Sequence, residues 1–140
     1  MPDNLCRVLM VGDSVGRPGH RANLTSIEKL RKRYSPDFVS INVENAEEGF
    51  GITEDTATEL LANDFNVLTT GNHIWQRKEV YSFLDSEERT LRTATYPNGN
   101  PGHGTCIVEA RGLRVGVVNL QGRERMPSIE LAEVPFEETI

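Results

Sequence analysis

Three apolar runs in this sequence each stop at residues that could bind a metal ion or move a proton. The residues at these stops are carboxylates, amides and one imidazole, in chain order Asp13, Glu44, Asn45, Asn72 and His73. Carboxylate and amide oxygens suit hard divalent cations, imidazole suits borderline ones, and two-metal hydrolases need a carboxylate that can bridge the pair. These residue types in this order are therefore typical of phosphoester hydrolysis at a divalent-metal site.

Four of these residues have a direct role in that chemistry. Asp13 and Glu44 could each hold a cation, with Glu44 spanning both, while the amide oxygen of Asn72 adds a neutral ligand. Two cations roughly 3.5 to 4 Å apart lower the pKa of a shared water toward neutrality and clamp the phosphoryl oxygens. His73 suits a general acid that protonates the departing alkoxide, because histidine gives and takes protons near neutral pH.

Taken one at a time, the same residues also have structural interpretations. Asp13 could be a helix N-cap or a surface residue, and Glu44-Asn45 could be a turn. Asn72-His73 could be a loop whose imidazole hydrogen-bonds the backbone. Their combination is a stronger signal, because the carboxyl ends of parallel strands share one edge of an open α/β sheet. That topology would bring all three stretches to one crevice.

The elements that would position these residues alternate between strands and helices. Strands are expected over residues 6–11, 37–43 and 65–70, and helices over 20–34, 54–63 and 76–84. In the first helix the apolar residues recur at spacings of three and four, and Thr53 is a suitable N-cap for the second. The order β-α-β-α-β-α predicts a parallel sheet with right-handed crossovers. The first strand is continuously apolar, which predicts a central strand buried on both faces.

The pattern changes in the second half of the chain. Strands are expected over residues 91–96, 105–110 and 113–120, with turns at 97–102 and 111–112 and no helix between them. This predicts an α/β fold in which a parallel β-α-β-α-β core is followed by antiparallel strands. We assign residues 1–122 to one domain and the polar, proline-punctuated residues 123–140 to a connecting tail.

Composition narrows the class of protein. The 140 residues are 37% hydrophobic and 26% charged, as in a soluble globular domain. A net charge of −6 argues against bulk nucleic-acid binding. Cys6 and Cys106 each fall in a predicted strand and form no C-x-x-C motif, which argues against a disulfide framework or zinc knuckle and favours a reducing cytosol. The N-terminus has no signal-peptide pattern, so we expect a cytoplasmic protein without a membrane span.

Five linked motifs resemble those of the YmdB-type metallophosphoesterases, in the calcineurin-like superfamily. They are Gly12-Asp13-x-Val15-Gly16, then Val43-Glu44-Asn45-Ala46 with Gly49-x-Gly51-Ile52-Thr53, then Thr70-Gly71-Asn72-His73-x-Trp75, then Tyr96-Pro97 with Pro101-Gly102-x-Gly104, and Val118-Asn119-Leu120-Gln121-Gly122-Arg123. The resemblance covers nearly the whole chain, in the correct order, and corresponds to the N-terminal half of such proteins.

The resemblance implies an α/β/β/α metallophosphoesterase sandwich, incomplete in this chain. It also implies a dinuclear centre of iron or manganese and a metal-activated water that cleaves a small phosphodiester, a 2′,3′-cyclic nucleotide. Carried over by motif, Asp13 would bind one metal, Glu44 would bridge, Asn72 would bind the other, and Asn45 would lie in or against the coordination shell. His73 would be the catalytic histidine.

Arg123 closes the last motif and has two interpretations, a contact to the substrate phosphate or a structural salt bridge. The chain also departs from the family pattern. Family members are longer and supply further ligands from later Gly-His and His-x-His motifs, whereas the histidines here are His20, His73 and His103, none in such a setting. Gln76 stands where the family usually has an aspartate, so an outer contact of the site could be weaker.

These departures predict weak metal binding, partly occupied ion sites and little or no turnover by this chain alone. An uncovered sheet edge and apolar surface are also expected. A truncated gene, an expressed fragment, a homo-oligomer and a chain completed by a second chain all stay open as interpretations.

Two other functional classes are open. Gly12-Asp13-Ser14 resembles the nucleophile block of SGNH/GDSL esterases, in which Ser14 would attack an ester carbonyl, but the late Asp-x-x-His motif that supplies the base is absent. A non-catalytic regulatory or interaction role is the third class, and the missing ligands motivate it. Sensitivity to EDTA would favour a metal site, and sensitivity to a fluorophosphonate would favour the serine.

Overall fold

The computed structural model describes residues 5–122 and 124–126. Its elements, in chain order, are β1 (Val8–Asp13), α1 (Gly16–Tyr34), β2 (Phe38–Asn42), α2 (Glu54–Ala62), β3 (Val67–Thr69), the 3₁₀ turns η1 (Asn72–Gln76) and η2 (Lys78–Val80), α3 (Tyr81–Ser86), β4 (Thr90–Leu91), β5 (Thr105–Ala110) and β6 (Leu113–Val118). The predicted alternation of strands and helices in the first half is confirmed.

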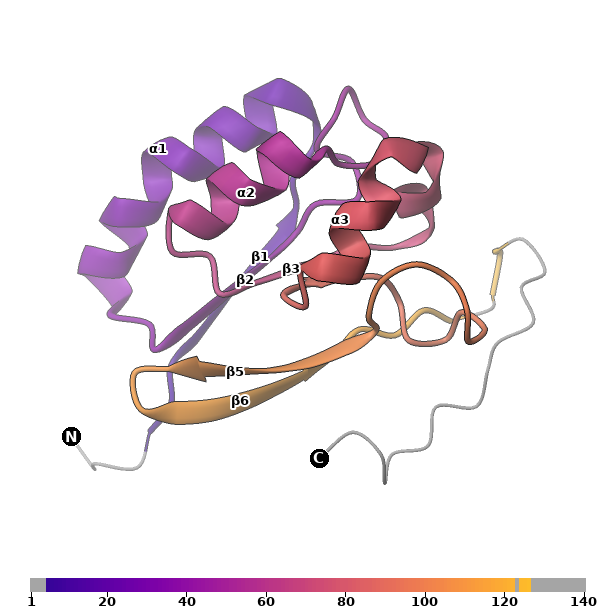
Figure 1. The fold of residues 1–140 in the computed structure, drawn as a ribbon. Coiled ribbons are helices and arrows are strands. Elements are labelled where there is room, and N and C mark those ends of the chain that lie inside the picture. The colour runs from indigo at the N-terminus through magenta and orange to yellow at the C-terminus, as the bar shows by residue number, and fades with distance from the viewer. Residues whose placement is uncertain (1–4, 123, 127–140) are drawn as a thin grey trace.

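The strands form two sheets. Four parallel strands pair in the order β1-β2-β3-β4, and β5 pairs with β6 as an antiparallel hairpin. Figure 1 shows α1, α2 and α3 on one face of the parallel sheet and the β5–β6 hairpin on the other. The chain therefore has an α/β/β arrangement, which confirms the predicted fold class.

Local sequence signals explain where α2 begins and where the hairpin turns. The Thr56 N–H donates to Thr53 Oγ1 at 3.3 Å, so the predicted N-cap is confirmed, with acidic residues in the first turn. Arg111 and Gly112 both have positive φ angles, 49° and 79°, as a two-residue turn between twisted antiparallel strands requires. Helix α1 begins four residues earlier than predicted, at Gly16.

Two apolar layers hold the sheet in place. The larger lies between the sheet and the helices, and its members include Ile27, Val39, Ile41, Leu60, Leu68, Ile74 and Leu84. The smaller joins the sheet to the hairpin through Phe38, Val67, Leu91 and Ala110, with Cys106, Val108, Val115 and Val117 packed against them. Alternate residues of β2 and β3 thus belong to different layers, as the two-residue repeat of a strand requires.

The prediction that the first strand is central was wrong. In the described sheet β1 is an edge strand, paired with β2 alone. Its residues Leu9 and Val11 pack against the helix layer, whereas Val8 and Met10 are 52% and 77% exposed. A continuous apolar run fits burial on both faces, but the hairpin layer contains residues of β2, β3 and β4 and none of β1. Cys6 precedes the strand and is exposed.

Two further boundaries differ from the sequence-based expectation. The strand predicted at 91–96 is reduced to β4, which joins the parallel sheet, and the chain turns after it, with Tyr96 N–H donating to Thr93 O. The helix predicted over 76–84 is divided between η2 and α3, and the 3₁₀ turn η1 precedes it. Propensity alone does not resolve such short turns.

Within the described residues no helix combines the length and apolar character needed to cross a membrane. Cys6 and Cys106 are both free thiols, which agrees with the prediction of no disulfide framework. The domain boundary at residue 122, the tail and the cytoplasmic location stay predictions, and the tail lies almost entirely outside the described residues.

Candidate metal centre

The loops that follow β1, β2 and β3 meet at the carboxyl edge of the sheet. Backbone hydrogen bonds join them: Ser14 N–H donates to Asn42 O at 2.9 Å, Gly16 N–H to Asn45 O at 2.8 Å, and Val43 N–H to Thr69 O at 2.9 Å. The three predicted strand ends therefore form one connected surface, as parallel topology requires.

Three of the predicted site residues form a hydrogen-bonded chain. Asn45 Nδ2 donates to Asp13 Oδ2 at 2.7 Å, and Asn45 Oδ1 lies 2.5 Å from His73 Nδ1. A carboxylate only accepts, so the amide nitrogen faces Asp13 and leaves the amide oxygen to accept from the imidazole. This arrangement places the His73 ring proton on Nδ1. It links a carboxylate, an amide and an imidazole that lie at the carboxyl ends of β1, β2 and β3.

Glu44 lies beside the same ring nitrogen of His73. Its Oε2 is 3.8 Å from His73 Nδ1 and accepts a long hydrogen bond, 3.5 Å, from the His73 backbone N–H. Gly71 makes room for this carboxylate, because a Cβ at that position would lie 2.5 Å from both Glu44 carboxylate oxygens. The Glu44 side chain is 21% exposed.

The remaining site predictions have different outcomes. Asn72 opens η1, between Gly71 and His73, and is half-buried at the same edge. Arg123 lies outside the described residues, so its role stays a prediction. Two histidines do not join the cluster: His20 pairs with Glu59 at 2.8 Å, and His103 lies 3.2 Å from the Asp85 carbonyl.

The donor set fits part of a divalent-metal shell. Two carboxylates with exposed surface and two amides lie at one edge, which is oxygen chemistry that hard cations accept. The described residues nevertheless contain no group of three or more His, Cys, Asp or Glu placed to hold a metal ion. The amide nitrogen and oxygen of Asn45 both form contacts within the cluster. These contacts favour a position against the coordination shell of the metal over a position in it.

The structure disfavours the serine-esterase interpretation. Ser14 is 2% exposed, and its hydroxyl accepts a hydrogen bond from Asn23 Nδ2 at 2.9 Å. A nucleophile must reach the substrate carbonyl and needs a base within hydrogen-bond reach. Ser14 instead ties the loop after β1 to helix α1.

A buried cation follows β4. Arg92 is 8% exposed, and its guanidinium donates to Gly102 O at 3.2 Å and to Thr93 O at 2.9 Å. Burial lowers the pKa of this guanidinium from its ordinary value. Two carbonyl partners replace water here, so Arg92 fastens the chain after β4 to the turn that holds Gly102.

Phe50 is a site neighbour that the sequence interpretation missed. It occupies the unassigned position of the Gly49-x-Gly51 motif, and its ring lies 5.1 Å from the His73 ring, centroid to centroid. The ring is 56% exposed. A bulky aromatic residue between two glycines was the signal available in the sequence.

Comparison with known proteins gives one family. The model of the family described as YmdB-like protein matches residues 9–139. A 2′,3′-cyclic-nucleotide 2′-phosphodiesterase of Bacillus subtilis is 40% identical over 124 residues, which cover 89% of this chain and 47% of that protein. A putative phosphatase/phosphodiesterase of Mycoplasma pneumoniae is 24% identical over 123 residues, covering 85% and 44%.

Solved structures agree on the fold. A hypothetical protein from Thermus thermophilus superposes with a TM-score of 0.79 at 35% identity, over 89% of this chain and 48% of that one. A novel phosphatase from Mycoplasma pneumoniae superposes with a TM-score of 0.83 at 23% identity, over 96% and 49%. The chain spans about half the length of the relatives it matches.

Proposed function

This chain belongs to the YmdB-like protein family, and from that premise we propose that it carries half of the active site of a metal-dependent phosphodiesterase for 2′,3′-cyclic nucleotides. The observation that carries the proposal is the chain of contacts Asp13–Asn45–His73, with Glu44 beside it. The relative from Bacillus subtilis, whose name states this activity, supports the substrate class.

Asp13, Glu44 and Asn72 are the residues we propose to hold the metal, with Glu44 between two ions of the iron or manganese type. Divalent ions there would supply positive charge to a phosphodiester and favour ionisation of an attacking water. Asn45 would orient Asp13 on one side and His73 on the other. Because this donor set is incomplete, we expect weak binding until further ligands join it.

His73 is the group that would move a proton to the leaving oxygen. With Nδ1 donating to Asn45, the ring nitrogen left for proton transfer is Nε2. A general acid must carry the proton that it delivers, and Nε2 is the ring atom that could carry it to the substrate. His73 would thus protonate the departing ribose oxygen as the cyclic phosphate opens.

A chimaera tests the function directly. The chain would be joined to the C-terminal half of the Bacillus subtilis relative, which would supply the missing part, and assayed with 2′,3′-cyclic AMP and MnCl₂. We expect chelator-sensitive hydrolysis that falls at least about 100-fold in Asp13→Asn, Glu44→Gln and His73→Ala. Glu48→Gln is the matched control, because Glu48 is exposed on the same loop as Glu44. A folded, active chimaera in which all three variants keep full activity would refute the proposal.

The 140-residue chain should be assayed in parallel. It should hydrolyse the same substrate slowly or not at all, because its described histidines other than His73 lie away from the cluster. A rate like that of a full-length relative would show that the chain needs no further ligands. Completion by a second chain or by self-association is part of the proposal, and mixing with the separate C-terminal half of the relative tests it.

The alternative is a non-catalytic regulatory or interaction role. The absence of a group of three metal-binding side chains among the described residues favours it. It predicts no divalent-metal dependence of any property of the chain. It would be preferred over the phosphodiesterase if the chimaera folds, binds no metal and hydrolyses no cyclic nucleotide.

A further inference from the structure

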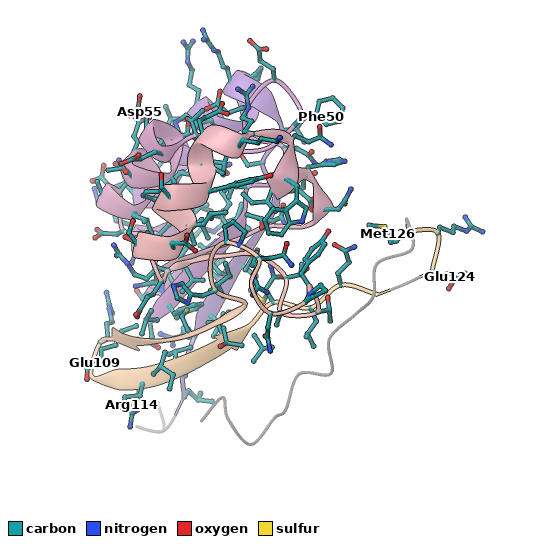
Figure 2. All side chains as sticks on the ribbon, turned by 45° about the vertical axis from the view of Figure 1, so that its right-hand side comes forward. Phe50, Asp55, Glu109, Arg114, Glu124 and Met126 are labelled. Carbon is teal, nitrogen blue, oxygen red and sulfur yellow. The ribbon has the colours of Figure 1, made fainter. Side chains whose placement is uncertain are left out.

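Phe50 is the feature of the site that the chemistry above leaves unused. Its ring projects outward from the loop between β2 and α2, at the outer edge of the fold (Figure 2). At 56% exposure it is one of two largely exposed aromatic residues in the described part of the chain, and the other, Tyr34, ends helix α1. Exposing an aromatic ring forgoes the stabilisation that burial would give.

The loop holds the ring beside the proposed catalytic histidine. The two rings meet edge to face, with centroids 5.1 Å apart and planes inclined at 66°. This geometry is a favourable aromatic contact that still leaves one side of the phenyl ring open. The Phe50 ring is therefore a flat apolar surface in direct contact with the ring of His73, the residue proposed to protonate the leaving group.

The backbone, and not the ring, determines the shape of this loop. Phe50 N–H donates to Glu47 O at 2.8 Å, and Arg77 Nε donates to Phe50 O at 3.2 Å. Gly49 and Gly51 flank the residue at φ angles of 91° and 74°, which only glycine adopts readily. Replacing the ring should therefore leave the loop in place, and the ring itself is free for another use.

We propose that Phe50 is the base-stacking residue of this site, receiving the nucleobase of the cyclic nucleotide whose phosphate lies near His73. This inference rests on the proposed function and deepens it by assigning recognition of the base. A single ribose joins the cyclic phosphate to the base, so a base must lie close to the histidine that serves the phosphate. Stacking on an aromatic side chain accepts any base, because every base has a π face. The site would then bind nucleotides without strong preference among bases.

The test compares a ligand that has a base with one that lacks it. The first probe is 2-aminopurine riboside 2′,3′-cyclic phosphate, whose fluorescence falls on stacking. The second is ribose 2′,3′-cyclic phosphate, whose affinity is measured by its displacement of the first probe. Both are titrated into the full 140-residue chain at the same MnCl₂ concentration. We expect the base to improve affinity roughly 5- to 10-fold, the lower end of the range for stacking, because one ring edge stays in solvent.

Variants assign that gain to the ring. Phe50→Ala and the size-matched Phe50→Leu should remove both the affinity gain and the fluorescence quenching, and Phe50→Trp should retain both. Tyr34→Ala is the matched control, since it removes the other exposed ring at the far end of α1, and it should change neither. Thermal melts of all variants check the fold.

The outcomes separate the two claims. Equal base-dependent affinity and quenching in wild type and Phe50→Ala would overturn the stacking role while the proposed function stands. Binding of the two probes with equal affinity by the wild type would also overturn it. Binding of neither probe would overturn the role of Phe50 as a base-stacking residue in this chain, and the activity of the chimaera then tests the substrate class separately.

Discussion

At the scale of single residues, Gly71 controls the position of a proposed metal ligand. A Cβ at this position would lie 2.5 Å from both oxygens of Glu44, so one of the two must move, and the end of a side chain moves more easily than the backbone. Gly71→Ala should therefore lower Mn²⁺ affinity about 10-fold or more while the melting temperature changes little. Isothermal titration and a thermal melt on the same samples measure both. Loss of stability with unchanged metal affinity would contradict this account of Gly71.

Asn45 should determine the tautomer of His73. Its amide oxygen lies 2.5 Å from His73 Nδ1 and can accept a hydrogen bond from the ring only if the ring proton is on Nδ1. In nitrogen-15 NMR spectra of the neutral ring, the wild type should show the Nδ1–H form. In Asn45→Ala the Nε2–H form should gain population. The same tautomer in both proteins would mean that Asn45 does not orient the ring.

The sequence predicted which side chains lie together better than it predicted their contacts. The types and spacing of Asp13, Glu44 and His73 indicated a shared crevice, because parallel topology leaves few other places for three strand ends. The bridging position of Asn45 depends on which way an amide points, and spacing carries no information about that. Phe50 was missed because the motif defined the glycines around it and not the residue between them.

At the scale of elements, the β5–β6 hairpin determines the chemistry of Cys106. The residue belongs to the layer between hairpin and sheet, and burial raises its thiol pKa to about 11. The thiolate is the reactive form, so Cys106 should resist alkylation by iodoacetamide at pH 8 and become reactive only as pH approaches 11. Peptide mapping by mass spectrometry measures this, with the exposed Cys6 as internal control.

Alkylation of the unfolded chain is the control for the predicted protection of Cys106. In denaturant Cys106 should react as readily as Cys6, because the burial that protects it is gone. Equal alkylation of both thiols in the native chain at pH 8 would mean that the hairpin does not pack on the sheet as described.

The elements that sequence predicted well are those with complete local signals. Helix α2 has its Thr53 cap, and the hairpin has its two-residue turn, so each boundary was expected within a residue or two. The position of β1 in the sheet was wrong because strand order is a tertiary property. The sequence of an apolar strand does not show whether the hairpin layer covers it. Here the hairpin layer leaves Met10 exposed.

At the scale of the whole molecule, we predict that the exposed side of β1 is a surface for association. Val8 and Met10 lie on the face opposite the helices, on the strand that forms one edge of the described sheet. We expect the chain to self-associate at high concentration and Met10→Lys to reduce this without loss of stability, because the side chain is already 77% exposed. Analytical ultracentrifugation measures the change, and a wild-type chain that stays monomeric at all concentrations would contradict it.

The strand-end carboxylates are proposed to hold a divalent metal. The most direct test of this proposal is an electron paramagnetic resonance titration of Mn²⁺ into the 140-residue chain and into Glu44→Gln and Glu48→Gln. We predict weak, saturable binding of Mn²⁺ by the wild type and Glu48→Gln, and affinity reduced at least about 10-fold in Glu44→Gln. Binding of equal strength in all three proteins, or in none, would contradict it.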